Sequence, residues 1–129
     1  MIIDFHTHVF PEKIAAATVG ALASSANTRP YSDGTVAGLL DSLRACGADA
    51  AVNLPVLTKP SQFDSIARFA SEINRREYTD ARIISFAGIH PDCEDFEERL
   101  NKLIATSRYQ KKTVTTEVDE NSMQKSFSK

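Results

Sequence analysis

The sequence predicts an α/β fold with a parallel sheet, and three observations support this prediction. Short apolar runs at 1–5, 48–54 and 82–89 have the length and composition of buried parallel strands. Segments with helical spacing of apolar residues follow these runs, so strand and helix alternate three times along the chain. A proline follows each run within a few residues, where a strand should stop. Such alternation is typical of right-handed parallel α/β units.

The first predicted strand ends in His6 and His8, two histidines separated by one residue. Side chains alternate along a strand, so both imidazoles are expected on one face, about 7 Å apart along the backbone. Rotated toward each other, two imidazoles at that spacing can bind one metal ion at about 2.0–2.1 Å each. Asp4 shares this face and could orient an imidazole. The alternative interpretation is that the pair only forms a polar rim at the strand end.

The opposite face of this strand is expected to pack against a covering helix, through Ile3, Phe5 and Thr7. Residues 12–22 then predict a short helix with an acidic first turn. A loop at 24–34 is rich in turn residues. Within it, Arg29 and Tyr31 are expected to face solvent, the alternative being contact with a substrate carboxylate.

The segment 35–46 is the clearest helix, because its apolar residues recur at helical spacing and Gly47 supplies a left-handed stop. The second strand, 48–54, follows it, and a helix over 60–77 begins at Pro60. After the third strand, a last helix is predicted over 95–105. Its inward residues are expected to be Phe96, Leu100, Leu103 and Ile104.

Composition excludes several classes of protein. The chain has 129 residues, of which 42% are hydrophobic, so it can form one domain with a single core. Its net charge of -2 gives no basic surface for nucleic acid or anionic lipid. No apolar run approaches the length of about 20 residues that spans a membrane. Cys46 and Cys93 do not form a metal-type pair, and a small secreted scaffold would carry more cysteines, so we expect reduced thiols and a cytoplasmic protein.

The segment 3–11, Ile-Asp-Phe-His-Thr-His-Val-Phe-Pro, resembles the opening of the amidohydrolase superfamily, and most closely its amidohydrolase-related branch. Members of this branch begin with Asp-x-His-x-His and commonly continue with an aromatic residue and a proline. The TatD-like nucleases and the polymerase-and-histidinol-phosphatase group share part of this signature. The resemblance covers residues 1 to about 105 and is strongest at 1–11 and 86–92.

The resemblance implies a fold and a cofactor. Members of the superfamily are (β/α)₈ TIM barrels that bind one or two divalent metal ions, mostly zinc. Residues 1–106 would then be the first three βα units of an incomplete TIM-type barrel, since a complete barrel needs about 250 residues. His6 and His8 would be metal ligands, with zinc as the metal.

A second signature, Gly-Ile-His-Pro-Asp at 88–92, resembles the sequence that often ends the third strand in these families. His90 is not usually a metal ligand in them, so the resemblance implies a catalytic role on the substrate side. Imidazole titrates near neutrality, which suits proton transfer. The alternative is that His90 only shapes the turn before Pro91.

Three hypotheses on function follow from the resemblance. The first is a metal-dependent hydrolase, in which water activated by the metal attacks the carbonyl of an amide, ester or lactone in a small-molecule substrate. The second is a non-oxidative decarboxylase of the same branch, and the third is a non-catalytic remnant. The later strands that complete the family's metal site have no counterpart in this sequence, so activity of this chain alone is doubtful.

The remaining expectations concern the end of the chain and the open sheet. Residues 107–129 are polar and are expected to be a disordered tail or the product of an altered reading frame. Half a barrel would leave apolar side chains without neighbours, so we expect self-association or a second chain to cover them. The residues concerned are Ile2, Val52, Leu54, Ile84 and Phe86.

Overall fold

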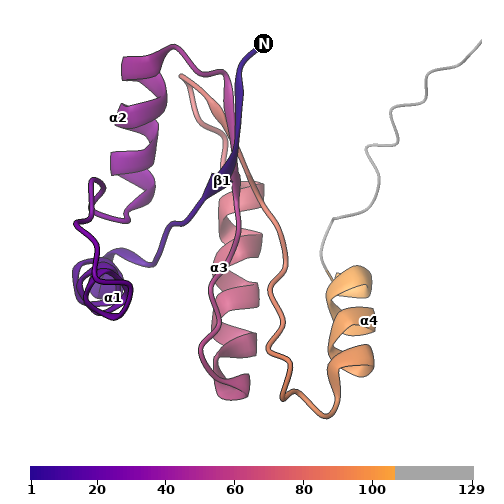
Figure 1. The fold of residues 1–129 in the computed structure, drawn as a ribbon. Helices are drawn as coiled ribbons and strands as arrows, with labels where there is room; N and C mark the ends of the chain where they lie inside the picture. The colour runs from indigo at the N-terminus through magenta and orange to yellow at the C-terminus, as the bar shows by residue number, and fades with distance from the viewer. Residues whose placement is uncertain (107–129) are drawn as a thin grey trace, which may run out of the picture. The chain divides into compact units, whose positions relative to one another are not determined.

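The computed structural model describes residues 1–106, and this range contains three parallel strands and four α-helices (Figure 1). The prediction of an α/β fold with a parallel sheet is therefore confirmed. The chain divides into two units, one from Met1 to Phe96 and another that begins at Glu97. The sheet and helices α1 to α3 belong to the first unit, and α4 is described by itself. The predicted polar tail, 107–129, lies outside the described residues.

The sheet has the order β1-β2-β3, with β2 in the centre. Strand β1 spans Ile3–Thr7, β2 spans Ala50–Asn53 and β3 spans Arg82–Ser85. Both pairings are parallel and place Thr7 beside Asn53, and Asn53 beside Ser85. The carboxyl ends of all three strands therefore meet at one edge of the sheet.

Strand β1 contains an irregularity that the sequence does not reveal. Asp4 is level with Ala51 and Thr7 with Asn53, so three steps along β1 correspond to two along β2. This is the arrangement of a β-bulge, which interrupts the strict alternation of side chains. Thr7 is buried as predicted, but Phe5 is 66% exposed and Ile3 38% exposed. The prediction that these two apolar residues pack under a helix is wrong.

Helix α2, Val36–Cys46, begins and ends where its sequence predicts. Thr35 caps the amino end, its Oγ1 accepting a hydrogen bond from the Gly38 N–H at 2.9 Å. Gly47 ends the helix with a φ of 68°, a conformation that costs little only for glycine.

Helix α1, Glu12–Ser25, runs three residues beyond its predicted end. Helix α3, Phe63–Arg75, follows a short 3₁₀ turn at Pro60–Gln62.

Helices α2 and α3 supply the core against the sheet. Leu43 from α2 and Ile73 from α3 are each 2% exposed, and they join Ala51 and Ile83 of the sheet in one cluster. The other buried members of this cluster are Val9, Leu39 and Ala48. Side chains alternate along a strand, so the residues directly before and after Ala51 and Ile83 point to the opposite face of the sheet.

The residues expected to lack neighbours differ in their exposure. Ile2 is 60% exposed and Phe86 is 48% exposed, as predicted. Val52, in contrast, is only 3% exposed, so the prediction is wrong for this residue. Val52 lies on the central strand between β1 and β3, whereas Ile2 and Phe86 lie outside the strands.

Helix α4 spans Phe96–Thr106, close to its predicted range. Of its four predicted inward residues, Leu103 is 9% exposed, whereas Phe96 is 46% and Ile104 is 66% exposed. The prediction is wrong for Phe96 and Ile104. Helical spacing places apolar side chains on one side of a helix, but it does not supply a surface that covers all of them.

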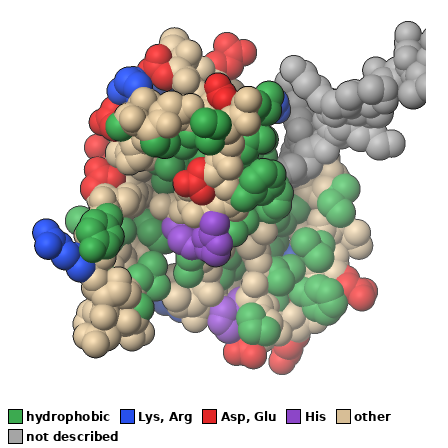
Figure 2. All heavy atoms as spheres, turned by 45° about the horizontal axis from the view of Figure 1, so that its top comes forward, with side chains coloured by type: hydrophobic (Ala, Val, Ile, Leu, Met, Phe, Trp, Pro, Cys, Tyr) green, Lys and Arg blue, Asp and Glu red, His purple; other side chains and the backbone are tan. Residues whose placement is uncertain are grey.

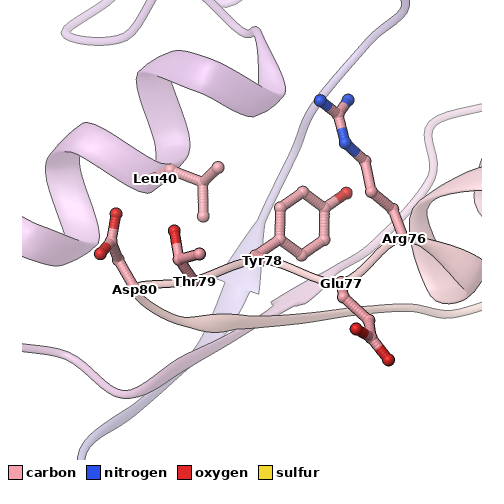
Figure 3. A pocket seen from close by; sticks show the side chains of 6 residues that line it. All are labelled: Leu40, Arg76, Glu77, Tyr78, Thr79 and Asp80. Carbon is pink, nitrogen blue, oxygen red and sulfur yellow. The ribbon is translucent and has the colours of Figure 1, made fainter.

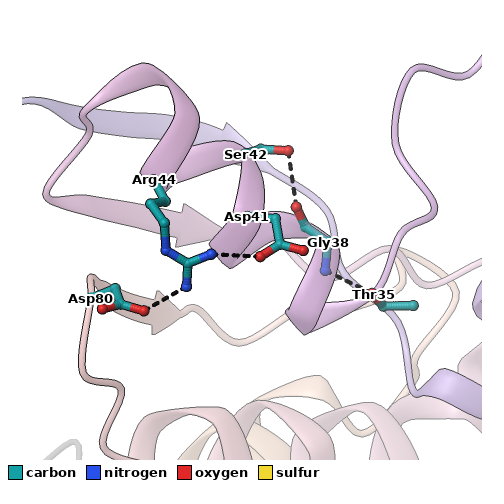
Figure 4. Close-up of polar contacts among 6 residues, drawn as sticks. All are labelled: Thr35, Gly38, Asp41, Ser42, Arg44 and Asp80. Carbon is teal, nitrogen blue, oxygen red and sulfur yellow. Dashed lines mark hydrogen bonds and ion pairs between the residues drawn. The ribbon is translucent and has the colours of Figure 1, made fainter.

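An arginine on α2 links that helix to the segment before β3 (Figure 4). Arg44 Nη1 donates to Asp41 Oδ1 at 2.8 Å, and Nη2 donates to Asp80 Oδ2 at 2.6 Å. These hydrogen bonds, first that to Asp80, raise the pKa of Arg44. Because all three side chains are about half exposed or more, water screens the ion pairs and they add little to stability.

Two glycines provide a matched test of backbone conformation. Gly47→Ala should lower the free energy of unfolding by about 1 kcal/mol, because alanine is strained at a φ of 68°. Gly20→Ala should raise the same quantity by about 0.5–1 kcal/mol. Gly20 is exposed inside α1, and an added Cβ would meet nothing within 4 Å. Urea unfolding of both variants measures the difference, and equal effects of the two substitutions would contradict the assignment.

Candidate metal-binding site

The candidate site lies at the edge where the three parallel strands end. Open α/β sheets bind ligands at the carboxyl ends of their strands. Here His8 follows β1 directly and Leu54 follows β2, whereas His6 is the penultimate residue of β1 itself. The histidine pair thus occupies the expected edge.

The two histidine side chains converge. The Nε2 atoms of His6 and His8 are 3.1 Å apart, and the two ring centroids are 4.9 Å apart with an interplanar angle of 82°. Two nitrogen atoms that each lie about 2.0–2.1 Å from one tetrahedral zinc ion are about 3.4 Å from each other. The spacing of the two Nε2 atoms is thus close to that of a ligand pair. Both side chains are exposed.

The backbone of β2 fixes the orientation of one ring. His8 Nδ1 lies 2.7 Å from the carbonyl oxygen of Leu54, which can only accept a hydrogen bond. His8 therefore carries a proton on Nδ1, and in the neutral ring its Nε2 lone pair accepts a hydrogen bond from His6 Nε2 at 3.1 Å, a bond that a metal ion would replace. Metal-binding histidines are held in the same way, through a hydrogen bond from the second ring nitrogen.

Asp4 does not have the role that the sequence suggests. Its Oδ1 accepts a hydrogen bond from the backbone N–H of His6 at 3.1 Å, and within residues 1–106 it makes no hydrogen bond to an imidazole. The expectation that Asp4 orients an imidazole is therefore wrong in this structure. The Leu54 carbonyl takes that role, because it faces His8 across the strand ends.

A buried polar network holds the strand ends together, and sequence reasoning missed it. Asn53 is 1% exposed; its Oδ1 accepts from the Val9 N–H at 2.9 Å and its Nδ2 donates to Ser85 Oγ at 2.7 Å. The Ser85 N–H in turn donates to Asn74 Oδ1 on α3 at 2.8 Å. Thr7 Oγ1 donates to the Val52 carbonyl at 2.9 Å. The available signal was a polar residue closing each apolar strand, at Thr7, Asn53 and Ser85.

His90 shapes a turn of its own. Its Nδ1 accepts a hydrogen bond from the Asp92 N–H at 3.2 Å, and its carbonyl accepts from the Cys93 N–H at 3.0 Å. The ring is partly buried, at 17% exposure. Figure 2 shows the histidine side chains as two separate purple patches, with hydrophobic side chains beside them. Among residues 1–106, no three His, Cys, Asp or Glu side chains are grouped so that they could bind a metal ion.

The histidine pair therefore fits two ligand positions of a zinc ion and no more. Catalytic zinc usually has three protein ligands and one open position, and structural zinc has four. Neither His90 nor Asp4 joins the pair within the described part of the chain. We accordingly derive no catalytic step through a metal from these residues.

A shallow pocket of about 220 Å³ lies at the other end of the sheet, between α2 and the segment before β3 (Figure 3). Its lining residues are Leu40, Arg76, Glu77, Tyr78, Thr79 and Asp80. Burial raises the pKa of the Tyr78 hydroxyl, and Arg76, whose guanidinium carbon is 5.7 Å from the ring centroid, lowers it in part. None of the residues that line this pocket is a candidate site residue predicted from the sequence.

Two further expectations concern the loop after α1 and the membrane. Tyr31 is 95% exposed and Arg29 is exposed, which agrees with their expected orientation toward solvent. No helix in the range 1–106 combines the length and apolar character needed to cross a membrane.

Comparisons of the chain with protein-family models, with curated proteins and with solved structures gave no match.

Proposed function

We propose that this chain binds a divalent metal ion, zinc by preference, through His6 and His8, and that it is related to the metal-dependent hydrolases of the amidohydrolase-related branch. The observation that supports the proposal is the convergence of the two Nε2 atoms to 3.1 Å at the carboxyl edge of a parallel sheet. A single His-x-His in a loop would lack both the convergence and the supporting contact from Leu54.

The chain's own residues hold and orient the ligand pair. The Leu54 carbonyl fixes the His8 ring, and the Asn53 network holds the strand ends from which both histidines project. Zinc bound in a hydrolase polarises a carbonyl oxygen and makes water a better nucleophile. We propose amides, esters or lactones of small molecules as the substrate class. Hydrolysis requires a more complete ligand set than residues 1–106 provide.

The cysteines support a reducing compartment as the site of action. Cys46 is exposed and Cys93 is buried, and both are free thiols. An exposed free thiol persists where thiols are kept reduced. We therefore propose a cytoplasmic location for the protein.

Zinc titration by calorimetry tests the ligand assignment. A single wild-type chain should bind zinc with an affinity far below that of structural sites, which gain about 10–16 kcal/mol from complete ligand sets. His6→Ala or His8→Ala should abolish the binding, because a single imidazole leaves zinc essentially hydrated. His90→Ala is the matched control and should retain most of it, since His90 belongs to a separate turn.

The variant His6→Ala/His8→Ala gives the decisive comparison. If it bound zinc as tightly as the wild type, the ion would have other ligands and the proposed function would lose its basis. Far-ultraviolet circular dichroism of each variant shows whether the fold is retained, which both exposed positions should permit.

A further inference from the structure

We propose that a second copy of this chain completes the metal site: His6 and His8 of two copies bind one zinc ion, in a four-imidazole site on a twofold axis. This inference rests on the proposed zinc binding by the same pair. It adds the partner, the stoichiometry and a structural consequence, a homodimer that forms only with the metal.

The geometry of the pair suits one half of a tetrahedral site. With Nε2 atoms 3.1 Å apart and metal–nitrogen distances of about 2.0–2.1 Å, the angle at the metal is about 100°, near the tetrahedral value. The two rings stand almost perpendicular, at 82°, so each can direct its Nε2 lone pair to the shared point without ring overlap. A tetrahedral zinc ion held by this pair has two further positions to fill.

Residues 1–106 provide nothing to fill those two positions. No third His, Cys, Asp or Glu side chain in this range is grouped with the pair. Zinc strongly favours four ligands, and closed sites of four protein ligands are the stable ones. A twofold axis through the ion supplies the two missing imidazoles from an identical surface, which is how most homodimers are built.

The surroundings of the pair can accept a second copy. His6 and His8 are both exposed, so their Nε2 atoms are within reach of another molecule. Phe5, between Asp4 and His6 on β1, is 66% exposed, and Ile3 is 38% exposed. β1 is an edge strand of the sheet formed by residues 1–106. The exposed apolar side chains of β1 are accessible to a second copy, and burial of apolar surface favours association.

Molar mass and zinc content measured together test the inference on the full chain. Light scattering during a zinc titration should show a monomer of 14.2 kDa without zinc and twice that mass with it. The transition should be complete at half an equivalent of zinc per chain. A chelator should return the protein to the monomer. His8→Ala should remain monomeric throughout, whereas the control His90→Ala should dimerise like the wild type.

Each other outcome has a definite meaning. One zinc ion bound per monomeric chain would overturn the bridged dimer and leave the proposed metal binding intact. A dimer that forms without zinc, or a zinc-dependent dimer of His8→Ala, would also overturn it, because the histidine pair would not be the bridge. Failure of wild-type protein to bind any zinc would remove both proposals. The stoichiometry of the wild type decides the question even if a variant fails to fold.

Discussion

Leu43→Ala is expected to lower the free energy of unfolding by about 3–5 kcal/mol. Leu43 is 2% exposed and lies where α2 meets the sheet, in one cluster with Ala51, Ile73 and Ile83. Removing its isobutyl group loses the transfer free energy of the buried carbons and leaves a cavity that four rigid elements can fill only in part. Small domains have a total stability of about 5–15 kcal/mol, so this variant should lie close to unfolding at 37 °C.

Urea unfolding monitored by circular dichroism measures the effect, and two controls make it specific. Leu43→Met keeps the side-chain volume and should cost less than about 1.5 kcal/mol. Ile14→Ala removes a similar side chain from α1 at a position that is 51% exposed, and it should cost less than about 1 kcal/mol. Equal midpoints for Leu43→Ala and Ile14→Ala would show that the cluster is not the core.

Asn53→Ala is expected to lower the free energy of unfolding by about 2–4 kcal/mol, although it removes a polar side chain. Asn53 is 1% exposed and connects the strand ends, accepting from the Val9 N–H and donating to Ser85 Oγ. The substitution leaves the buried Val9 N–H without this acceptor, and each buried group that loses its partner costs about 1–3 kcal/mol. The loss should be larger than for Asn101→Ala, which changes an exposed helical residue and should stay within about 0.5 kcal/mol.

A double-mutant cycle separates the hydrogen bond from other effects of the substitution. Asn53→Ala and Ser85→Ala are combined, and a coupling free energy of about 0.5–3 kcal/mol is expected for two residues in one network. Strict additivity of the two substitutions would contradict a direct contribution of the bond between Asn53 and Ser85.

The limits of α2 were predictable from the sequence because the signals are local, whereas α1 runs three residues beyond its predicted end and α3 is shorter than the predicted helix over 60–77. Thr35 and Gly47 mark the two ends of α2 by their own side-chain and backbone preferences, and the structure places the cap and the left-handed residue at those positions. The parallel sheet followed from the alternation of strands and helices. The position of the histidine pair at a strand end followed in the same way, since it depends only on where the apolar run stops.

Features that depend on register could not be predicted. The extra residue in β1 exists only relative to β2, so nothing in residues 3–7 alone shows that Phe5 will be exposed. Asn53 and Ser85 are 32 positions apart, and only the pairing of β2 with β3 makes them hydrogen-bond partners. The acceptor that orients His8 is a backbone carbonyl, which every residue carries, so no residue type could have identified Leu54.

The strand order has a consequence for how the chain folds during its synthesis. Each strand pairs with the one made just before it, β2 with β1 and then β3 with β2. Ribosomes add about 5–20 residues per second, so the 32 residues from Ala50 to Arg82 take roughly 2–6 s. Each new strand can therefore pair as soon as it is made, because its partner strand has already been synthesised. Ile73 and Ile83 complete the central cluster, so Leu43 and Ala51 should remain accessible to chaperones until β3 leaves the exit tunnel.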